Sequence, residues 1–141
     1  MTKTLSVVPL PNEFFVSPIA HRGLHDCDGR FGSGRTENSF AACMFAMSEG
    51  YGVEVDIQLS EDGVPVVFHD DNLERLLKVN KKVNELPLNS LKKLRLANKE
   101  QIPTLDELLE MISGQVPVLV ELKDQNSPFG KRRNKKPAHY S

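Results

Sequence analysis

Residues 53–59 read VEVDIQL, and this stretch decides the predicted fold. Its β-branched apolar residues are typical of a buried strand. Successive side chains of a strand point to opposite faces, so Glu54 and Asp56 share one face and the apolar residues share the other. Two carboxylates about 7 Å apart on one face form half of a binding site for a hard cation. The competing interpretation is exposed charge on one face of an open sheet.

Apolar runs and helical periodicity alternate in the order strand, helix, strand, strand, helix, strand. This order predicts an α/β fold with a mostly parallel sheet. The turn at residues 61–63 is too short for a helical crossover. Residues 70–88 are expected to be irregular, and residues 89–96 to form a short helix. The predicted strands span 14–20, 53–59, 65–68 and 117–122, and the longer predicted helices span 37–49 and 104–113.

The last predicted strand repeats the alternation, with Glu121 and Lys123 on one face. If this strand neighbours residues 53–59, Glu121 completes an oxygen cage for Mg²⁺ or Ca²⁺. Lys123 then either stabilises phosphate charge or pairs with Glu121.

His21 and His69 each follow an apolar run, at the carboxyl end of a predicted strand. A lone histidine at such a place is more often structural. A pair suits general acid–base chemistry on a phosphodiester, because one imidazole removes a proton and the other donates one. Arg22 offers a planar fork for phosphate oxygens, or else forms a salt bridge to Glu37 or Glu54.

Three further polar residues have supporting roles in this interpretation. Glu37 and Asn38 lie where a glycine-rich loop becomes a helix, a place at which a plain helix cap is equally expected. Asp70 either orients His69 or caps the following turn.

The composition indicates a globular domain: 141 residues with 39% hydrophobic and 26% charged residues. The formal net charge of −1 argues against nucleic acid as a partner. We expect residues 1–124 to form the domain and residues 125–141, with five basic residues and no acid, to be a disordered tail. Cys27 and Cys43 are expected to be free thiols. No signal peptide or membrane span is apparent, which predicts a cytoplasmic protein.

Six motifs in order resemble the glycerophosphodiester phosphodiesterase family. They are His21-Arg22-Gly23, Glu37-Asn38-Ser39-Phe40, residues 54–63, residues 65–70, residues 102–107 and Val120-Glu121-Leu122-Lys123. The resemblance implies a TIM-type barrel that hydrolyses glycerophosphodiesters to glycerol 3-phosphate and an alcohol. It also implies catalysis by His21 and His69, a divalent metal on Glu54, Asp56 and Glu121, and phosphate binding by Arg22. It leaves open whether water or the neighbouring glycerol hydroxyl is the nucleophile.

A complete TIM barrel has eight strands and about 250 residues. Four predicted strands supply about the first half of such a barrel, so we expect a C-terminally truncated sequence. Open sheet edges would then favour self-association, and a monomer should have little or no activity. Two alternatives are a non-catalytic remnant or interaction fragment of the same fold and a related phosphodiesterase of the phospholipase C or D type.

Overall fold

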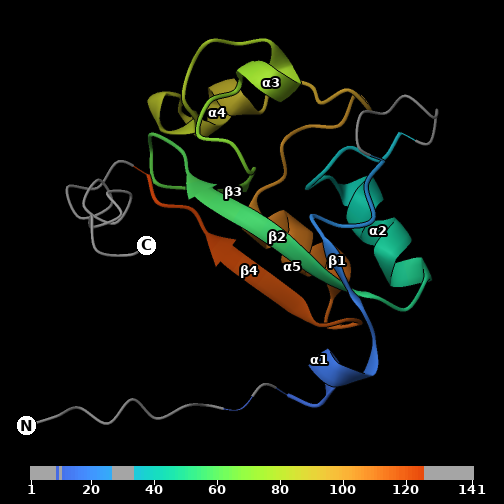
Figure 1. Ribbon diagram of the computed structural model, residues 1–141. Coiled ribbons are helices and arrows are strands. Elements are labelled where there is room, and N and C mark those ends of the chain that lie inside the picture. Colours follow the sequence, from blue (N-terminus) through green and yellow to red (C-terminus); the bar gives the residue numbers. More distant parts are fainter. Residues whose placement is uncertain (1–8, 10, 27–33, 126–141) are drawn as a thin grey trace, which may run out of the picture.

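A four-stranded sheet with β2 at its centre organises the computed structural model, which describes residues 9, 11–26 and 34–125 (Figure 1). β1 (Ile19–His21) and β4 (Val118–Leu122) run parallel to β2 (Gly52–Leu59) along its two edges. β3 (Pro65–Val67) pairs antiparallel with the last residues of β2. The predicted α/β fold with a mostly parallel sheet is confirmed.

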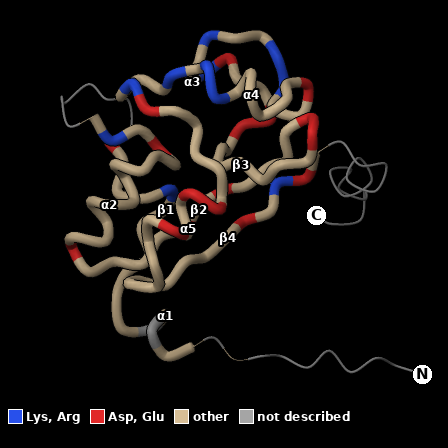
Figure 2. Tube along the Cα trace, turned by 180° about the vertical axis from the view of Figure 1, so that it is seen from behind, with Lys and Arg blue, Asp and Glu red and all other residues tan. Residues whose placement is uncertain are grey.

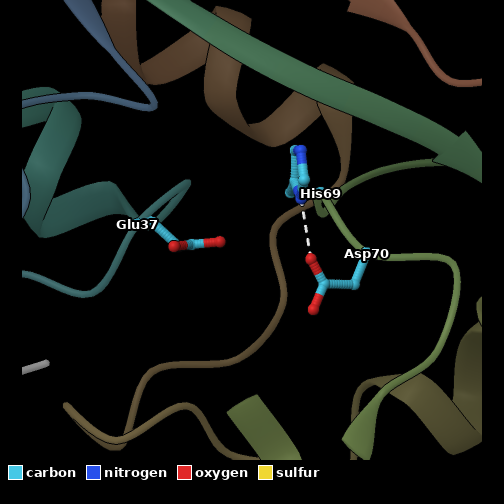
Figure 3. A group of neighbouring side chains, drawn as sticks. All are labelled: Glu37, His69 and Asp70. Carbon is cyan, nitrogen blue, oxygen red and sulfur yellow. Dashed lines mark hydrogen bonds and ion pairs between the residues drawn. The ribbon is translucent and has the colours of Figure 1, made fainter. Parts of the chain in front are cut away.

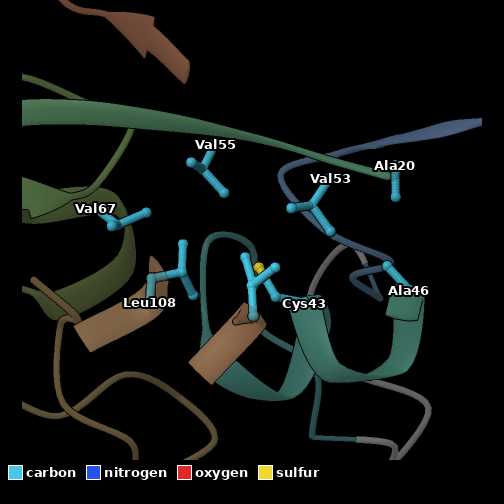
Figure 4. Packing of buried hydrophobic residues seen from close by; sticks show 8 residues of the cluster. Ala20, Cys43, Ala46, Val53, Val55, Val67 and Leu108 are labelled. Carbon is cyan, nitrogen blue, oxygen red and sulfur yellow. The ribbon is translucent and has the colours of Figure 1, made fainter. Parts of the chain in front are cut away.

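Two helices, α2 (Phe40–Ser48) and α5 (Leu105–Ile112), cover one face of the sheet. Val53 and Val55 of β2 are fully buried against Cys43 of α2 and Leu108 of α5 (Figure 4). The apolar face predicted for residues 53–59 is therefore the face that builds the core. The acidic face of the same strand points away from these helices.

Side chains cap both of the longer helices, although α2 begins three residues after the predicted start at residue 37. The Ser39 hydroxyl accepts a hydrogen bond from the Ala42 N–H (3.2 Å), and the Thr104 hydroxyl accepts one from the Glu107 N–H (3.1 Å). The Glu107 carboxylate itself takes part in a tertiary contact, because Lys92 donates to it (2.9 Å). The sequence places the start of α5 well, since its capping side chain is local.

The predicted first strand is too long at its amino end. Residues Glu13–Val16 form a helical turn, α1, and the strand begins only at Ile19. Pro18 explains the change, because a residue before proline is held in the extended region, as Ser17 is with ψ of 151°. The short α1 turn therefore ends before Pro18.

Short helical turns occupy the region predicted to be irregular. They are α3 (Glu74–Leu77), the 3₁₀ turn η1 (Val83–Glu85) and α4 (Leu88–Leu91), which is shorter than the helix predicted for residues 89–96. Figure 1 shows α3 and α4 beside the end of the sheet at which β2 finishes. A second apolar cluster around Phe68, Leu73 and Leu91 holds these turns together, so tertiary packing fixes them rather than helical periodicity.

Several predictions concern residues outside the described ranges. The tail predicted to be disordered lies there from residue 126 onward, and so does Cys27. Cys43 is a free, fully buried thiol, as predicted, and burial raises its pKa to about 12. None of the helices in the described ranges is long and apolar enough to span a membrane.

Gly23 provides a test of the contact between the β1 loop and α2. A Cβ at this position would lie 2.7 Å from the Ala42 backbone, and the backbone φ is +76°. Gly63 has a similar φ of +80°, but a Cβ at this position would have no atom of the described residues within 4 Å. We expect Gly63→Ala to cost about 1 kcal/mol of unfolding free energy and Gly23→Ala to cost about 1–3 kcal/mol more, measured by urea titration. Equal losses in the two variants would contradict this packing.

Candidate active site

Three carboxylates converge where β2 and β4 run side by side. Asp56 of β2 is in register with Glu121 of β4, and Glu54 precedes Asp56 on the same face of its strand. One oxygen from each of Glu54, Asp56 and Glu121 lies within 4.8 Å of the others. Figure 2 shows acidic positions along β2 and at the adjoining part of β4. We call these three residues the acid cluster.

Asp56 is fully buried, and its charge is compensated from two sides. The Asn38 amide donates to Asp56 Oδ2 (3.0 Å), and Lys123 Nζ lies 3.1 Å from Asp56 Oδ1. Burial alone would raise the pKa of Asp56, but these two partners lower it below its ordinary value. Lys123 also donates to Glu121 (2.8 Å), so the structure shows the pairing that the sequence had left open.

Glu54 has a different environment, although its carboxylate is nearby. Its Oε2 accepts the backbone N–H of Arg22 (3.1 Å) and lies 3.9 Å from His21 Nε2. Its Oε1 is buried and has no hydrogen-bond partner within the part of the chain that the structure describes. Burial raises the pKa of Glu54. An orphaned carboxylate oxygen beside two other acids fits a divalent cation that takes oxygen ligands.

Arg22 joins the loop after β1 to the acids. Its guanidinium Nη1 donates to Glu37 (3.3 Å), and its Nε lies 3.4 Å from Asp56. The predicted salt bridge to Glu37 is therefore present, whereas the contact with Glu54 runs through the Arg22 backbone. Arg22 also adopts a left-handed backbone with φ of 58°, a strained conformation for a residue with a side chain. Such strain is common at functional sites.

Asn38 and Glu37 lie in the turn before α2, not within the helix as predicted. Asn38 has φ of 57°, and its amide binds Asp56 twice, since its Oδ1 also accepts the Asp56 backbone N–H (3.2 Å). Ser39 caps the helix instead. Asn38 therefore holds the acidic strand, while Glu37 binds the guanidinium groups of Arg22 and Arg75.

His69 and Asp70 form a second cluster next to the first. His69 Nδ1 lies 2.7 Å from Asp70 Oδ1, and Figure 3 shows this bond with the Glu37 carboxylate facing it from another segment. Of the two roles predicted for Asp70, orienting His69 is the one observed. The next turn is capped by Asn72, whose Oδ1 accepts the Glu74 N–H (2.7 Å).

The antiparallel direction of β3 determines where His69 lies. The chain turns back after β2, and the Phe68 N–H donates to the Asp56 carbonyl (3.0 Å). This hydrogen bond brings the segment that carries His69 back to the level of Asp56. His21 lies at the end of a strand parallel to β2, as a mostly parallel sheet would have it. His69 instead follows an antiparallel strand.

Sequence reasoning missed two residues that contact the His69 segment, Gln58 and Arg75. Gln58 is 3% exposed and follows Asp56 by two positions, so strand periodicity places it on the acidic face. That signal was available in the sequence. Arg75 binds both Asp70 and Glu37, and no local pattern predicts this pairing across 38 residues.

A model of the Glycerophosphoryl diester phosphodiesterase family matches residues 21–138. The chain belongs to this family. It is 39% identical over 103 residues to mouse glycerophosphodiester phosphodiesterase 1, an alignment that covers 65% of this chain and 29% of the mouse protein. It is 38% identical over 102 residues to a glycerophosphodiester phosphodiesterase of Caldanaerobacter subterraneus, covering 67% of this chain and 39% of that one.

Solved structures of the family have the same architecture. A glycerophosphodiester phosphodiesterase from Parabacteroides distasonis matches with a TM-score of 0.67 and 31% identity, over 83% of this chain and 46% of that chain. A phosphodiesterase from Oleispira antarctica, solved with the product sn-glycerol-3-phosphate, matches with a TM-score of 0.64 and 35% identity, over 76% and 44%. The chain thus spans less than half the length of each of these relatives. The predicted partial TIM barrel is confirmed.

Asp70 gives the second cluster a defined pH dependence. Hydrogen bonds from Arg75, and to a lesser degree from His69, lower the pKa of Asp70 below its ordinary value. A depressed folded-state pKa stabilises the fold above the unfolded pKa of about 3.9, and this stabilisation is lost as pH falls through the folded pKa. We expect Asp70→Asn to lower the unfolding free energy at neutral pH, with a difference from wild type that shrinks in acid.

Urea titrations at neutral and acidic pH measure this difference. Asp71→Asn is the matched control, because Asp71 is the adjacent aspartate and is exposed. A loss of stability in Asp70→Asn that stays constant with pH would show that the Asp70 charge is not used in the fold.

Proposed function

We propose that this chain is a metal-dependent glycerophosphodiester phosphodiesterase that hydrolyses glycerophosphodiesters to glycerol 3-phosphate and an alcohol. The observation that carries the proposal is the acid cluster, with His21 Nε2 3.9 Å from Glu54 Oε2 and with His69 next to Phe68, whose N–H donates to the Asp56 carbonyl. The product bound to the Oleispira antarctica relative supports the same substrate class. We place the activity in residues 1–124.

In this proposal Glu54, Asp56 and Glu121 hold the divalent ion, either Mg²⁺ or Ca²⁺. Such an ion would neutralise charge on phosphoryl oxygens. The unpartnered Oε1 of Glu54 is the part of the site that favours a cation most directly.

The remaining residues bind phosphate and move protons. Arg22 lies against the acids with its side chain 18% exposed, so its guanidinium can bind a phosphate oxygen. Lys123 supplies a second positive charge from the side of β4. His21, with a 67% exposed side chain, and His69, with a 29% exposed one, exchange protons with the nucleophile and the leaving alcohol.

Histidine and acid variants test separate parts of this proposal. We expect His21→Ala and His69→Ala each to lower kcat for glycerophosphocholine by about 10²-fold or more while metal affinity is retained. Glu121→Gln should instead weaken Mg²⁺ or Ca²⁺ binding. Metal titration calorimetry and a choline-release assay give the two readouts.

His139→Ala is the matched control, because His139 lies outside the six family motifs. A chain that binds metal but turns over no substrate would support the non-catalytic remnant. Full activity in either His21→Ala or His69→Ala would contradict the proposed roles.

We also propose that the chain self-associates through the free edge of β4. Among the described strands, β4 pairs only with β2. Leu119 and Leu122 are 45% and 76% exposed along it, and unpaired strands with exposed apolar residues favour pairing with another chain.

Sedimentation velocity tests this proposal. Wild type should show a concentration-dependent rise in mass, and Leu122→Lys should shift the population toward monomer. Leu109→Lys, on the exposed side of α5, is the matched control, since Leu109 is 42% exposed and lies off the strand edge. A monomeric wild type at all concentrations would rule out this association.

A further inference from the structure

We propose that Gln58 and Arg75 are positioning residues for His69: Gln58 fixes its backbone, and Arg75 fixes its ring through Asp70. The inference deepens the proposed function, because the benefit to catalysis rests on His69 moving a proton. The hydrogen bonds of Gln58 and Arg75 are present in the structure whether or not the chain is active.

Gln58 holds the backbone on both sides of His69. Its side-chain Nε2 donates to the Phe68 carbonyl (2.9 Å) and to the Asp70 carbonyl (2.5 Å). Because Gln58 shares its strand face with the acid cluster, this amide ties the His69 segment to the strand that carries Glu54 and Asp56. A rigid strand is a better support for such geometry than a loop.

Arg75 holds the Asp70 carboxylate that contacts the imidazole. Its Nε lies 2.7 Å from Asp70 Oδ2 and its Nη2 lies 3.1 Å from Asp70 Oδ1. The same guanidinium binds Glu37 through Nη2 (2.5 Å) and Nη1 (3.2 Å). Asp70 is therefore clamped by a fork that is itself anchored on the turn before α2.

The carboxylate in turn selects the tautomer of His69. An ionised Asp70 accepts a hydrogen bond from the Nδ1–H (2.7 Å), so the neutral ring carries its hydrogen on Nδ1 and leaves Nε2 free. Hydrogen bonds from Arg75 lower the pKa of Asp70, which keeps it an acceptor. The free nitrogen is then the one that can accept or return a proton during reaction.

A bound metal is a competing explanation for this cluster, since single ligand atoms of Glu37, His69 and Asp70 lie within 4.8 Å of one another. The guanidinium of Arg75 already contacts both carboxylates of this group and supplies the positive charge. The acid cluster, by contrast, retains an unpartnered oxygen on Glu54. The geometry thus favours the Arg75 guanidinium as the cation between Glu37 and Asp70, and a metal ion at the acid cluster.

Packing alone does not explain the hydrogen bonds of the buried Gln58 amide. Its Oε1 is buried and has no hydrogen-bond partner within the described ranges. A buried amide kept only for packing would be expected to use both ends. Here only its donor end is used, and both donated bonds go to carbonyls of the residues on either side of His69, Phe68 and Asp70.

The test replaces each donor by an apolar side chain of similar length. Arg75→Met removes the fork, and Gln58→Met removes the amide donor. Arg95→Met and Gln101→Met are matched controls, because these exposed side chains donate to main-chain carbonyls of residues 92 and 94, away from the site.

The first readout is the tautomer of His69, measured from long-range proton–nitrogen couplings of the neutral ring. We expect the Nδ1–H form to predominate in wild type and in both controls. In Arg75→Met and Gln58→Met the population should shift toward the Nε2–H form. A merely structural role would not change this ratio.

The second readout is the division between kcat and KM. Misplacing a catalytic group should lower kcat by about 10²-fold with little change in KM or in Mg²⁺ affinity. If Arg75→Met does not fold, Arg75→Lys keeps the charge without the planar fork and should show the same shift of tautomer and kcat. Gln58→Glu likewise keeps the size and removes the donor.

An unchanged His69 tautomer in folded variants at both positions would overturn the proposal. Wild type without turnover but with the predicted tautomer shift would count against the proposed function and leave the positioning role supported. Turnover that is unaffected in both variants, while His69→Ala is inactive, would also overturn the positioning role.

Discussion

The Asp56 carboxylate, fully buried in the central strand, is the constraint on which the rest of the site depends. A buried charge is costly unless opposite charges and hydrogen bonds compensate it, and removing one partner of such a pair costs about 3–5 kcal/mol. Asn38 and Lys123 supply that compensation from the turn before α2 and from the end of β4. Segments 18 residues before Asp56 and 67 residues after it are thereby fixed on one face of the sheet.

Sheet register then decides which side chains meet. β1 and β4 flank β2 in parallel, so His21 lies level with Glu54, and Glu121 lies level with Asp56. β3 runs in the opposite direction and returns the chain to the same level, which brings in His69. Backbone hydrogen bonds between the strands thus bring the main chain of both histidines to the level of the acid cluster.

The charges around the site are arranged in two connected groups. In the acid cluster, Lys123 and Arg22 neutralise only part of the negative charge, and one Glu54 oxygen remains unpartnered among the described residues. In the group around His69, the Arg75 fork binds Asp70 and Glu37. Glu37 contacts both arginines and so links the two groups.

The sequence by itself determined the strand and helix order and the acidic and apolar faces of residues 53–59. These features depend on alternation, periodicity and local hydrogen bonds, all of which act over a few residues. Six short motifs in order were also sufficient to predict the family. The helical turn at Glu13–Val16 and the turns α3 and η1 were not predicted, because proline constraints and a separate apolar cluster fix them.

Only the tertiary structure decided the partners of the charged residues. Arg75 reaches Glu37 across 38 residues, and Gln58 binds carbonyls that a hairpin brings back to it. The same holds for Lys123, which pairs with Asp56 because β4 lies beside β2. Sequence spacing carries no information on such pairs, since they arise only when sheet register and strand direction bring distant segments together.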